Sequence, residues 1–138
     1  MKKIGDLYAI ELPNGKYAFG RVMKDAGLGI YKKIGNSKND LPNLEEYIFI
    51  ISVFDYVYKE TEWNHIKNIP FENEEDSWPP KRSVYDVISK SYSIYYKGEF
   101  YPSTEEECRD LEVGKVWDSS TLIDRIMVDD NYLKMINA

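Results

Sequence analysis

The sequence predicts an α+β fold, made mostly of a twisted antiparallel sheet or partly open β-barrel, with two short helices in the C-terminal third. Three observations support this: two strand-turn-strand patterns, one long apolar run rich in β-formers, and helix-capping signals late in the chain. The 138 residues are 43% hydrophobic and 14% aromatic. We therefore expect a single domain over residues 1–138.

The first strands follow from local patterns near the N-terminus. Residues 7–12 and 16–22 are apolar and aromatic runs separated by Pro-Asn-Gly, and Asn-Gly between such runs is a strong hairpin signal. A third strand is expected over 30–34, after turn glycines at 27 and 29. Residues 47–58 are almost continuously apolar, which predicts one long strand covered on both faces.

The second half of the chain alternates irregular and regular segments. Residues 59–82 contain three prolines and predict an irregular excursion with one short strand around 65–69. Residues 92–96 and 99–101 flank Lys-Gly and predict a second hairpin. Ser103 or Thr104 precedes three glutamates and predicts a short capped helix ending before Gly114. Asp118 or Ser119 is expected to cap a final helix.

Composition excludes several classes of function. The formal charge of -6 and pI near 4.9 oppose nucleic-acid binding. No run approaches the roughly 18 apolar residues of a membrane span, and no leader pattern opens the chain, so we expect a cytoplasmic protein with no membrane partner. One cysteine and one histidine exclude an intrachain disulfide and the common zinc sites, and no nucleotide-binding motif occurs. We expect no metal and no cofactor.

Candidate catalytic residues are few. Cys108 and His65 could form a nucleophile-base pair, but the glutamates beside Cys108 disfavour its thiolate, and a small buried side chain is the simpler role. Asp55 and Asp86 lie among apolar neighbours that could raise their pKa values, as a hydrolase would need. However, 24 acidic residues produce such pairs by chance, and strand-end carboxylates that face water or accept backbone hydrogen bonds are the simpler interpretation. The sequence predicts no catalytic site.

Charge is distributed unevenly along the chain. Residues 1–33 carry seven basic and three acidic side chains, whereas residues 34–138 carry eleven and twenty-one. One acidic cluster, within residues 72–76, precedes Trp78, and a second consists of Glu105 to Glu107. These clusters either face water or form an acidic, aromatic-edged surface that attracts a basic protein. The candidate partner-binding residues are Glu72, Glu74, Glu75, Asp76, Trp78 and Trp63.

Twelve tyrosines occur in the chain, and four of them cluster around the second predicted hairpin. Tyr92, Tyr95, Tyr96 and Tyr101 are either cross-strand packing partners or a recognition face.

Residues 5–22 combine a Gly-Asp-x-aromatic strand start, a tight turn and a Tyr-Ala-x-Gly-Arg-Val strand. This opening resembles the N-terminal signature of the immunity protein 26 family of bacterial polymorphic toxin systems. Weaker likeness continues through the strand ending at Asp55, the segment from Trp78 to Lys81, and the stretch from Glu107 to Trp117. The resemblance implies an antitoxin that binds a cognate toxin domain, and it supplies no catalytic residues. Many toxins of such systems are nucleases, whose basic clefts an acidic surface would complement.

Three hypotheses follow, and oligomeric state stays open in each. The first is a non-enzymatic immunity protein that neutralises a cognate toxin by masking its active-site cleft. The second is a small β-barrel module that binds a ligand or peptide through a Tyr95/Tyr96 face, and the third is a hydrolase using Asp55 or Asp86. Within the signature, Asp6 and Arg21 are expected to pair across the hairpin ends.

Overall fold

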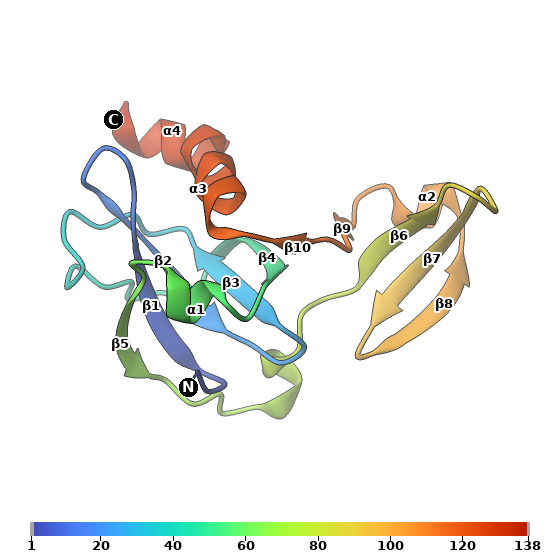
Figure 1. Cartoon of the computed structure of the whole chain (residues 1–138), viewed down its shortest axis with the longest axis horizontal. Helices are drawn as coiled ribbons and strands as arrows, with labels where there is room; N and C mark the ends of the chain where they lie inside the picture. The colour runs from blue at the N-terminus through green and yellow to red at the C-terminus, as the bar shows by residue number, and fades with distance from the viewer. Residues whose placement is uncertain (1, 138) are drawn as a thin grey trace.

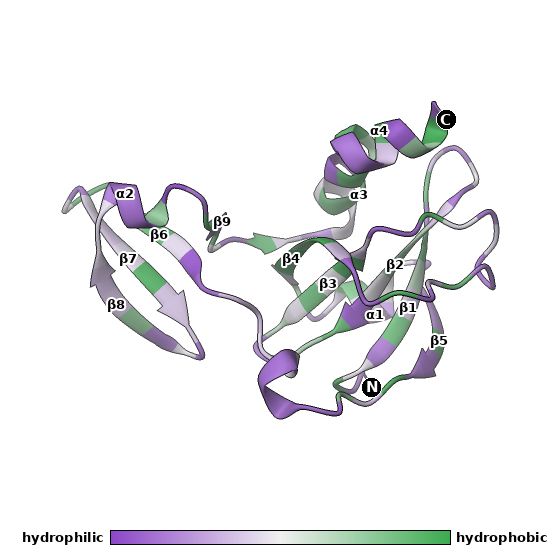
Figure 2. Cartoon of the chain, turned by 180° about the vertical axis from the view of Figure 1, so that it is seen from behind, coloured by the Kyte–Doolittle hydropathy of each residue, from purple (hydrophilic) through white to green (hydrophobic). Residues whose placement is uncertain are grey.

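The computed structural model describes residues 2–137 and contains two open β-sheets (Figure 1). The larger sheet has the strand order β10-β4-β3-β2-β1-β5, and the smaller has the order β8-β7-β6-β9. Both views show the smaller sheet projecting from one side of the larger body (Figures 1 and 2). The α+β class and the largely antiparallel pairing expected from the sequence are confirmed, and the sheets do not close into a barrel.

The elements have the following bounds. The larger sheet contains β1 (Asp6–Glu11), β2 (Tyr17–Val22), β3 (Gly27–Tyr31), β4 (Tyr47–Val53), β5 (Asn64–Asn68) and β10 (Val116–Trp117). The smaller sheet contains β6 (Arg82–Asp86), β7 (Ser91–Tyr96), β8 (Glu99–Ser103) and β9 (Glu112–Val113). The helical segments are α1 (Val57–Glu60), the 3₁₀ turn η1 (Glu74–Ser77), α2 (Glu105–Cys108), α3 (Ser119–Val128) and α4 (Asp130–Ile136).

The two predicted hairpins are present. In the first, β1 and β2 pair with Leu7 opposite Arg21 and Glu11 opposite Tyr17. In the second, β7 and β8 are joined by a turn in which Lys97 and Gly98 both have positive φ. Such a turn matches the twist of antiparallel strands, so each short sequence pattern defines its own hairpin.

The long strand expected over residues 47–58 ends early, at Val53. Phe54 and Tyr56 are exposed and stack on each other, with ring centroids 5.5 Å apart. The chain then turns into α1, which places Val57 in the core. A continuous apolar run carries no alternation, so it could not indicate where the strand stops. The third strand also begins earlier than expected, because Gly27 and Gly29 belong to β3 rather than to a turn.

The segment before the second sheet is irregular, as the prolines predicted, and contains one short strand. β5 pairs with β1 and forms one edge of the larger sheet. η1 follows, with the Asn73 side chain accepting a hydrogen bond from the Glu75 amide. This hydrophilic turn is the purple coil at the bottom of Figure 2.

Two caps expected near the C-terminus are confirmed. Thr104 accepts a hydrogen bond from the Glu107 amide and begins α2. Asp118 accepts one from the Thr121 amide and begins α3. α4 is an additional helix, which follows directly because Asp129 ends α3 and caps the next turn. Side-chain acceptors at these positions satisfy amides that the helix itself leaves free.

Apolar side chains fill both faces of the larger sheet. One cluster contains Tyr8, Ile10 and Val22 together with Leu122 and Ile126 from α3. The opposite cluster contains Leu7, Ala9, Phe19 and Tyr31, covered by Leu41, Tyr47, Ile66 and Ile69. Along β1, successive residues alternate between the two clusters, as the two-residue period of a strand requires.

Candidate functional site: an acidic cleft

A cleft of about 720 Å³ lies beside the larger sheet and contains most of the candidate partner-binding residues. We call it the acidic cleft. Its wall combines carboxylates, aromatic rings and prolines from β2, β4, the segment after β5 and the end of β7. The lining residues are Arg21, Met23, Glu45, Tyr47, Ile50, Ile69, Pro70, Phe71, Glu72, Glu75, Asp76, Trp78, Pro79, Pro80 and Tyr96.

Two glycines of β3 let other parts of the wall approach the sheet. A Cβ on Gly29 would lie 2.6 Å from the Tyr47 ring, and a Cβ on Gly27 would lie 2.5 Å from Cγ of Pro79. Real Cβ atoms do not approach other atoms so closely. The absence of side chains at both positions therefore allows Tyr47 and Pro79 to pack directly against β3.

One part of the cleft wall is a polar network centred on Glu45, whose side chain is half exposed. Its carboxylate accepts hydrogen bonds from the hydroxyls of Tyr31 and Tyr47, both at 2.7 Å, and from Nη1 of Arg21 at 2.9 Å. Burial opposes ionisation of Glu45, but these three donors outweigh it and lower its pKa. Burial and the bond to Glu45 raise the pKa of Tyr47 to about 12. Glu45 is thus held ionised by fixed donors.

Arg21 is the buried cation of this network. Its side chain is 6% exposed, donates to the Ile69 carbonyl as well as to Glu45, and stacks on Phe71 with 3.6 Å from Cζ to the ring centroid. Sequence reasoning did not place Arg21, Glu45, Tyr47 or Phe71 in the site. One signal was available: Arg21 shares a strand face with the apolar Phe19, so the hairpin register points its guanidinium inward.

The acidic segment, residues 72–76, contains carboxylates that are paired within the protein and carboxylates that are not. Glu74 pairs with Lys24 at 2.8 Å, and Glu75 pairs with Lys97 at 2.7 Å and accepts the Tyr96 hydroxyl at 2.9 Å. These contacts lower the pKa values of both glutamates. Across residues 2–137, the carboxylates of Glu72 and Asp76 have no such partner. These two are the carboxylates that remain available to another molecule.

Trp78 lies between the paired lysines. The ammonium of Lys24 is 4.9 Å from its ring centroid, and that of Lys97 is 5.6 Å away. Lys24 belongs to the β2–β3 turn and Lys97 to the β7–β8 turn. Trp78 and the two glutamates therefore connect the larger sheet to the smaller one, in addition to lining the cleft.

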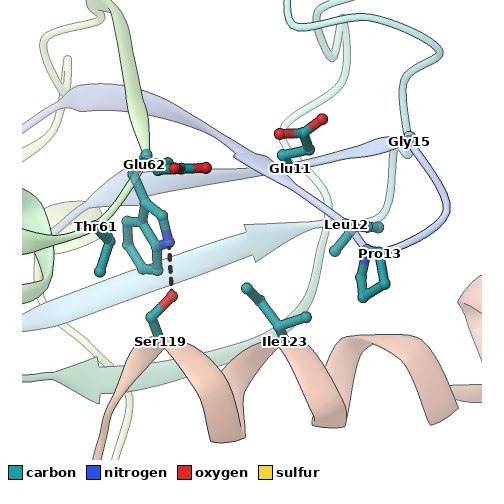
Figure 3. A pocket seen from close by; sticks show the side chains of 9 residues that line it. Glu11, Leu12, Pro13, Gly15, Thr61, Glu62, Ser119 and Ile123 are labelled. Carbon is teal, nitrogen blue, oxygen red and sulfur yellow. Dashed lines mark hydrogen bonds between the residues drawn. The ribbon is translucent and has the colours of Figure 1, made fainter.

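Trp63 lies elsewhere. Its side chain is 8% exposed, belongs to the core, and donates from Nε1 to Oγ of Ser119 at 3.0 Å. It borders a separate pocket formed by the first hairpin, Thr61, Glu62 and α3 (Figure 3). That pocket and the acidic cleft have no lining residue in common. The structure thus brings Glu72, Glu74, Glu75, Asp76 and Trp78 together and separates Trp63 from them.

The candidate catalytic carboxylates do not have the environment proposed for them. Asp55 is exposed and paired with Lys2, and Asp86 is exposed and accepts the amides of Ile88 and Ser89. Both contacts lower the pKa values of these groups rather than raising them. The alternative of carboxylates in an apolar environment is therefore wrong, and the simpler interpretation, carboxylates that face water or accept backbone hydrogen bonds, is confirmed.

The cysteine and histidine are also apart. Cys108 is buried under α2 against the Ser93 carbonyl of the smaller sheet, at 3.6 Å. His65 is half exposed on β5 of the larger sheet, where Nε2 lies 3.1 Å from Oδ1 of Asp6. The buried structural role expected for Cys108 is confirmed. Within residues 2–137, no group of three or more His, Cys, Asp or Glu side chains is placed to hold a metal ion.

The expected pair of Asp6 with Arg21 and the alternative of a Tyr95/Tyr96 binding face both fail, because strand residues alternate between faces. Arg21 is opposite Leu7, and both lie on the same face, whereas Asp6 lies on the other face with Tyr8. Arg21 pairs with Glu45, and Asp6 instead accepts from Asn68 and the Lys3 amide. Similarly, Tyr96 lines the acidic cleft while Tyr95 lines a different cavity, so the two do not form one binding face.

Comparisons with known proteins bear on the larger sheet and the acidic cleft. The sequence model of a family described as immunity protein 26 matches residues 3–94, from the start of β1 through most of β7. No curated protein and no solved structure matches the chain. In the described part of the chain, no helix has the length and apolar character needed to cross a membrane.

Proposed function

The chain belongs to the immunity protein 26 family, and from this premise we propose that it binds a cognate toxin domain and blocks it without catalysis of its own. Immunity proteins neutralise toxins, so membership of the family supports a toxin-neutralising role for this chain. We expect this action in the cytoplasm. We treat residues 1–138 as one domain, because Trp78 and the ion pairs beside it join the two sheets.

We place the toxin contact at the acidic cleft. The observation that carries this is the pair of unpartnered carboxylates, Glu72 and Asp76, in a cleft lined by aromatic rings. Aromatic residues in fully desolvated pockets dominate protein interfaces, and charges at the rim speed association with an oppositely charged partner. The matching toxin surface would be basic, as is the substrate cleft of a nuclease.

The cleft is also prepared for rigid binding. Glu45, Arg21 and Tyr47 hold one another through hydrogen bonds, and Glu74 and Glu75 are held by lysines. A preorganised surface loses less conformational entropy when a partner docks. Occlusion of an active site requires only such a stable, complementary surface.

The direct test is co-expression with the toxin encoded next to this chain. We expect restored growth of the host and a complex that copurifies at equimolar ratio. If growth is not restored and no complex copurifies, the proposed function is contradicted. A Glu72→Gln/Asp76→Asn variant tests the contact surface separately. If this variant restores growth and binds the toxin with wild-type affinity and association rate, the function stands but the contact surface lies elsewhere.

A further inference from the structure

A second cavity, of about 300 Å³, lies at the junction of the two sheets. It shares no lining residue with the acidic cleft. Its wall is mostly apolar and combines the β2–β3 turn, β4, three strands of the smaller sheet and the start of β10. The lining residues are Asp25, Ala26, Ser52, Arg82, Val84, Tyr95, Phe100, Gly114, Lys115 and Val116.

Arg82 lies at the inner wall of this cavity and is 3% exposed. Its Nη1 donates to Oγ of Ser52. In residues 2–137, neither its Nε nor its Nη2 has a hydrogen-bond partner. Buried donors are almost always paired, because an unpaired one has lost its hydrogen bonds to water without gaining another partner. Nε and Nη2 together form the side of the guanidinium that binds a carboxylate through two parallel hydrogen bonds.

An aromatic row leads from Arg82 to the cavity mouth. Arg82 is opposite Tyr95, and Tyr95 is opposite Phe100, so the three side chains share one face of the smaller sheet. The rings of Tyr95 and Phe100 are 5.0 Å apart, and Phe100 is 64% exposed. Phe100, at the far end of this row from Arg82, provides an apolar contact for the body of a ligand whose charged end reaches Arg82.

The opposite wall is a tight turn of unusual composition. Asp25 and Ala26 both have left-handed backbones, with φ of 55° and 59°, where glycine or asparagine is normally preferred. Asp25 raises the pKa of the Tyr95 hydroxyl, and Coulomb attraction from Asp25 acts on Arg82. Among the described residues, however, Asp25 and Arg82 form no ion pair. Asp25 is the acidic group that an incoming anion would meet.

We propose that this cavity binds an organic carboxylate, with the carboxylate on Nε and Nη2 of Arg82 and an apolar or aromatic body against Tyr95 and Phe100. Because both nitrogens lie beneath the surface, side chains of the cavity wall must shift as the ligand enters. This site is independent of the acidic cleft, and its failure would leave the proposed toxin binding untouched.

Benzoate is the probe, and its neutral analogue benzamide is the matched control. The Nε–Hε resonance of Arg82 in the ¹⁵N-labelled full chain is followed by NMR during each titration, and Arg82→Met assigns the signal. We expect benzoate to shift this resonance saturably and benzamide to leave it in place. Absence of a saturable shift, or equal shifts with both probes, would overturn the proposal.

Two variants keep the test independent of any folding defect caused by Arg82→Met. Asp25→Asn suits a left-handed turn and removes the repelling charge, so benzoate affinity should rise roughly threefold. Phe100→Ser removes an exposed ring and should weaken benzoate binding by roughly fivefold or more. The far-ultraviolet circular dichroism of each variant shows whether it folds like the wild type. Unchanged benzoate affinity in both folded variants would also overturn the proposal.

Discussion

Lys24 and Glu74 form an ion pair of 2.8 Å that joins the β2–β3 turn to η1 across fifty positions of sequence. Other basic side chains of residues 1–33 also form ion pairs with acidic residues later in the chain. Lys2 pairs with Asp55, Arg21 with Glu45, Lys32 with Glu46 and Lys33 with Asp40. Folding therefore pairs most of the basic side chains of residues 1–33 with acidic side chains, and the carboxylates left unpaired in the acidic cleft are Glu72 and Asp76.

This pairing separates two kinds of acidic residue by their effect on toxin binding. Glu72→Gln/Asp76→Asn should lower the association rate with the cognate toxin by roughly threefold to tenfold and flatten its dependence on salt. Glu105→Gln/Glu106→Gln in α2 is the control, because it removes the same charge away from the cleft. Stopped-flow fluorescence measures both. Equal slowing in the two variants would mean that net charge alone steers association.

Arg21 and Glu45 should be energetically coupled. Glu45→Gln leaves a buried guanidinium with a weaker acceptor, so we expect a coupling energy of about 1–3 kcal/mol in a double-mutant cycle with Arg21→Met. Urea unfolding measures each variant. The matched cycle of Arg21→Met with Asp6→Asn should give a coupling energy near zero, since those side chains lie on opposite faces of the sheet. A larger coupling in the second cycle would contradict this assignment.

Trp63 and Trp78 should differ in what they stabilise. Trp63→Ala removes a core ring and a hydrogen bond to Ser119, and should lower the free energy of unfolding by about 3–5 kcal/mol. Trp78→Ala should cost stability less but weaken toxin binding at least about tenfold, as expected for an aromatic anchor. Urea unfolding and titration calorimetry provide the two measurements. The reverse order of effects would move the binding site away from the cleft.

Stability should fall at acidic pH partly through Asp6. Burial favours its protonated form, but hydrogen bonds from Asn68 and the Lys3 amide, together with His65, lower its pKa below 3.8. A carboxylate with a lowered folded-state pKa stabilises the protein above its unfolded pKa, and this stability is lost as pH falls through the folded value. Unfolding free energies between about pH 2 and 5 should therefore slope less steeply in Asp6→Asn than in the wild type.

The helices outside the family match should be essential to the core. Leu122 is fully buried against the larger sheet, and Leu122→Ala should cost about 2–5 kcal/mol. Val128→Ala, at a side chain that is 71% exposed on the same helix, should stay within about 0.5 kcal/mol of wild type. A similar effect of both substitutions on thermal or urea unfolding would show that α3 does not complete the core.

Local chemistry in the sequence was sufficient to determine the hairpins around Gly15 and Gly98 and the caps at Thr104 and Asp118. These features depend on a few neighbouring residues, because turn geometry and free helix amides are satisfied within about four positions. The opening residues also carried the family, which the match over 3–94 confirmed.

Tertiary structure decided what depended on distant partners. Whether β4 continued past Val53 depended on the core position of Val57, and whether Glu74 was free depended on Lys24, fifty residues earlier. The burial of Arg82 without partners for two of its nitrogens arises only where two sheets meet. Charge and apolar character are properties of single residues, whereas pairing and burial are properties of residues brought together by the fold. For that reason the sequence alone determined the family and the local elements, and the tertiary structure selected which side chains remain available for binding.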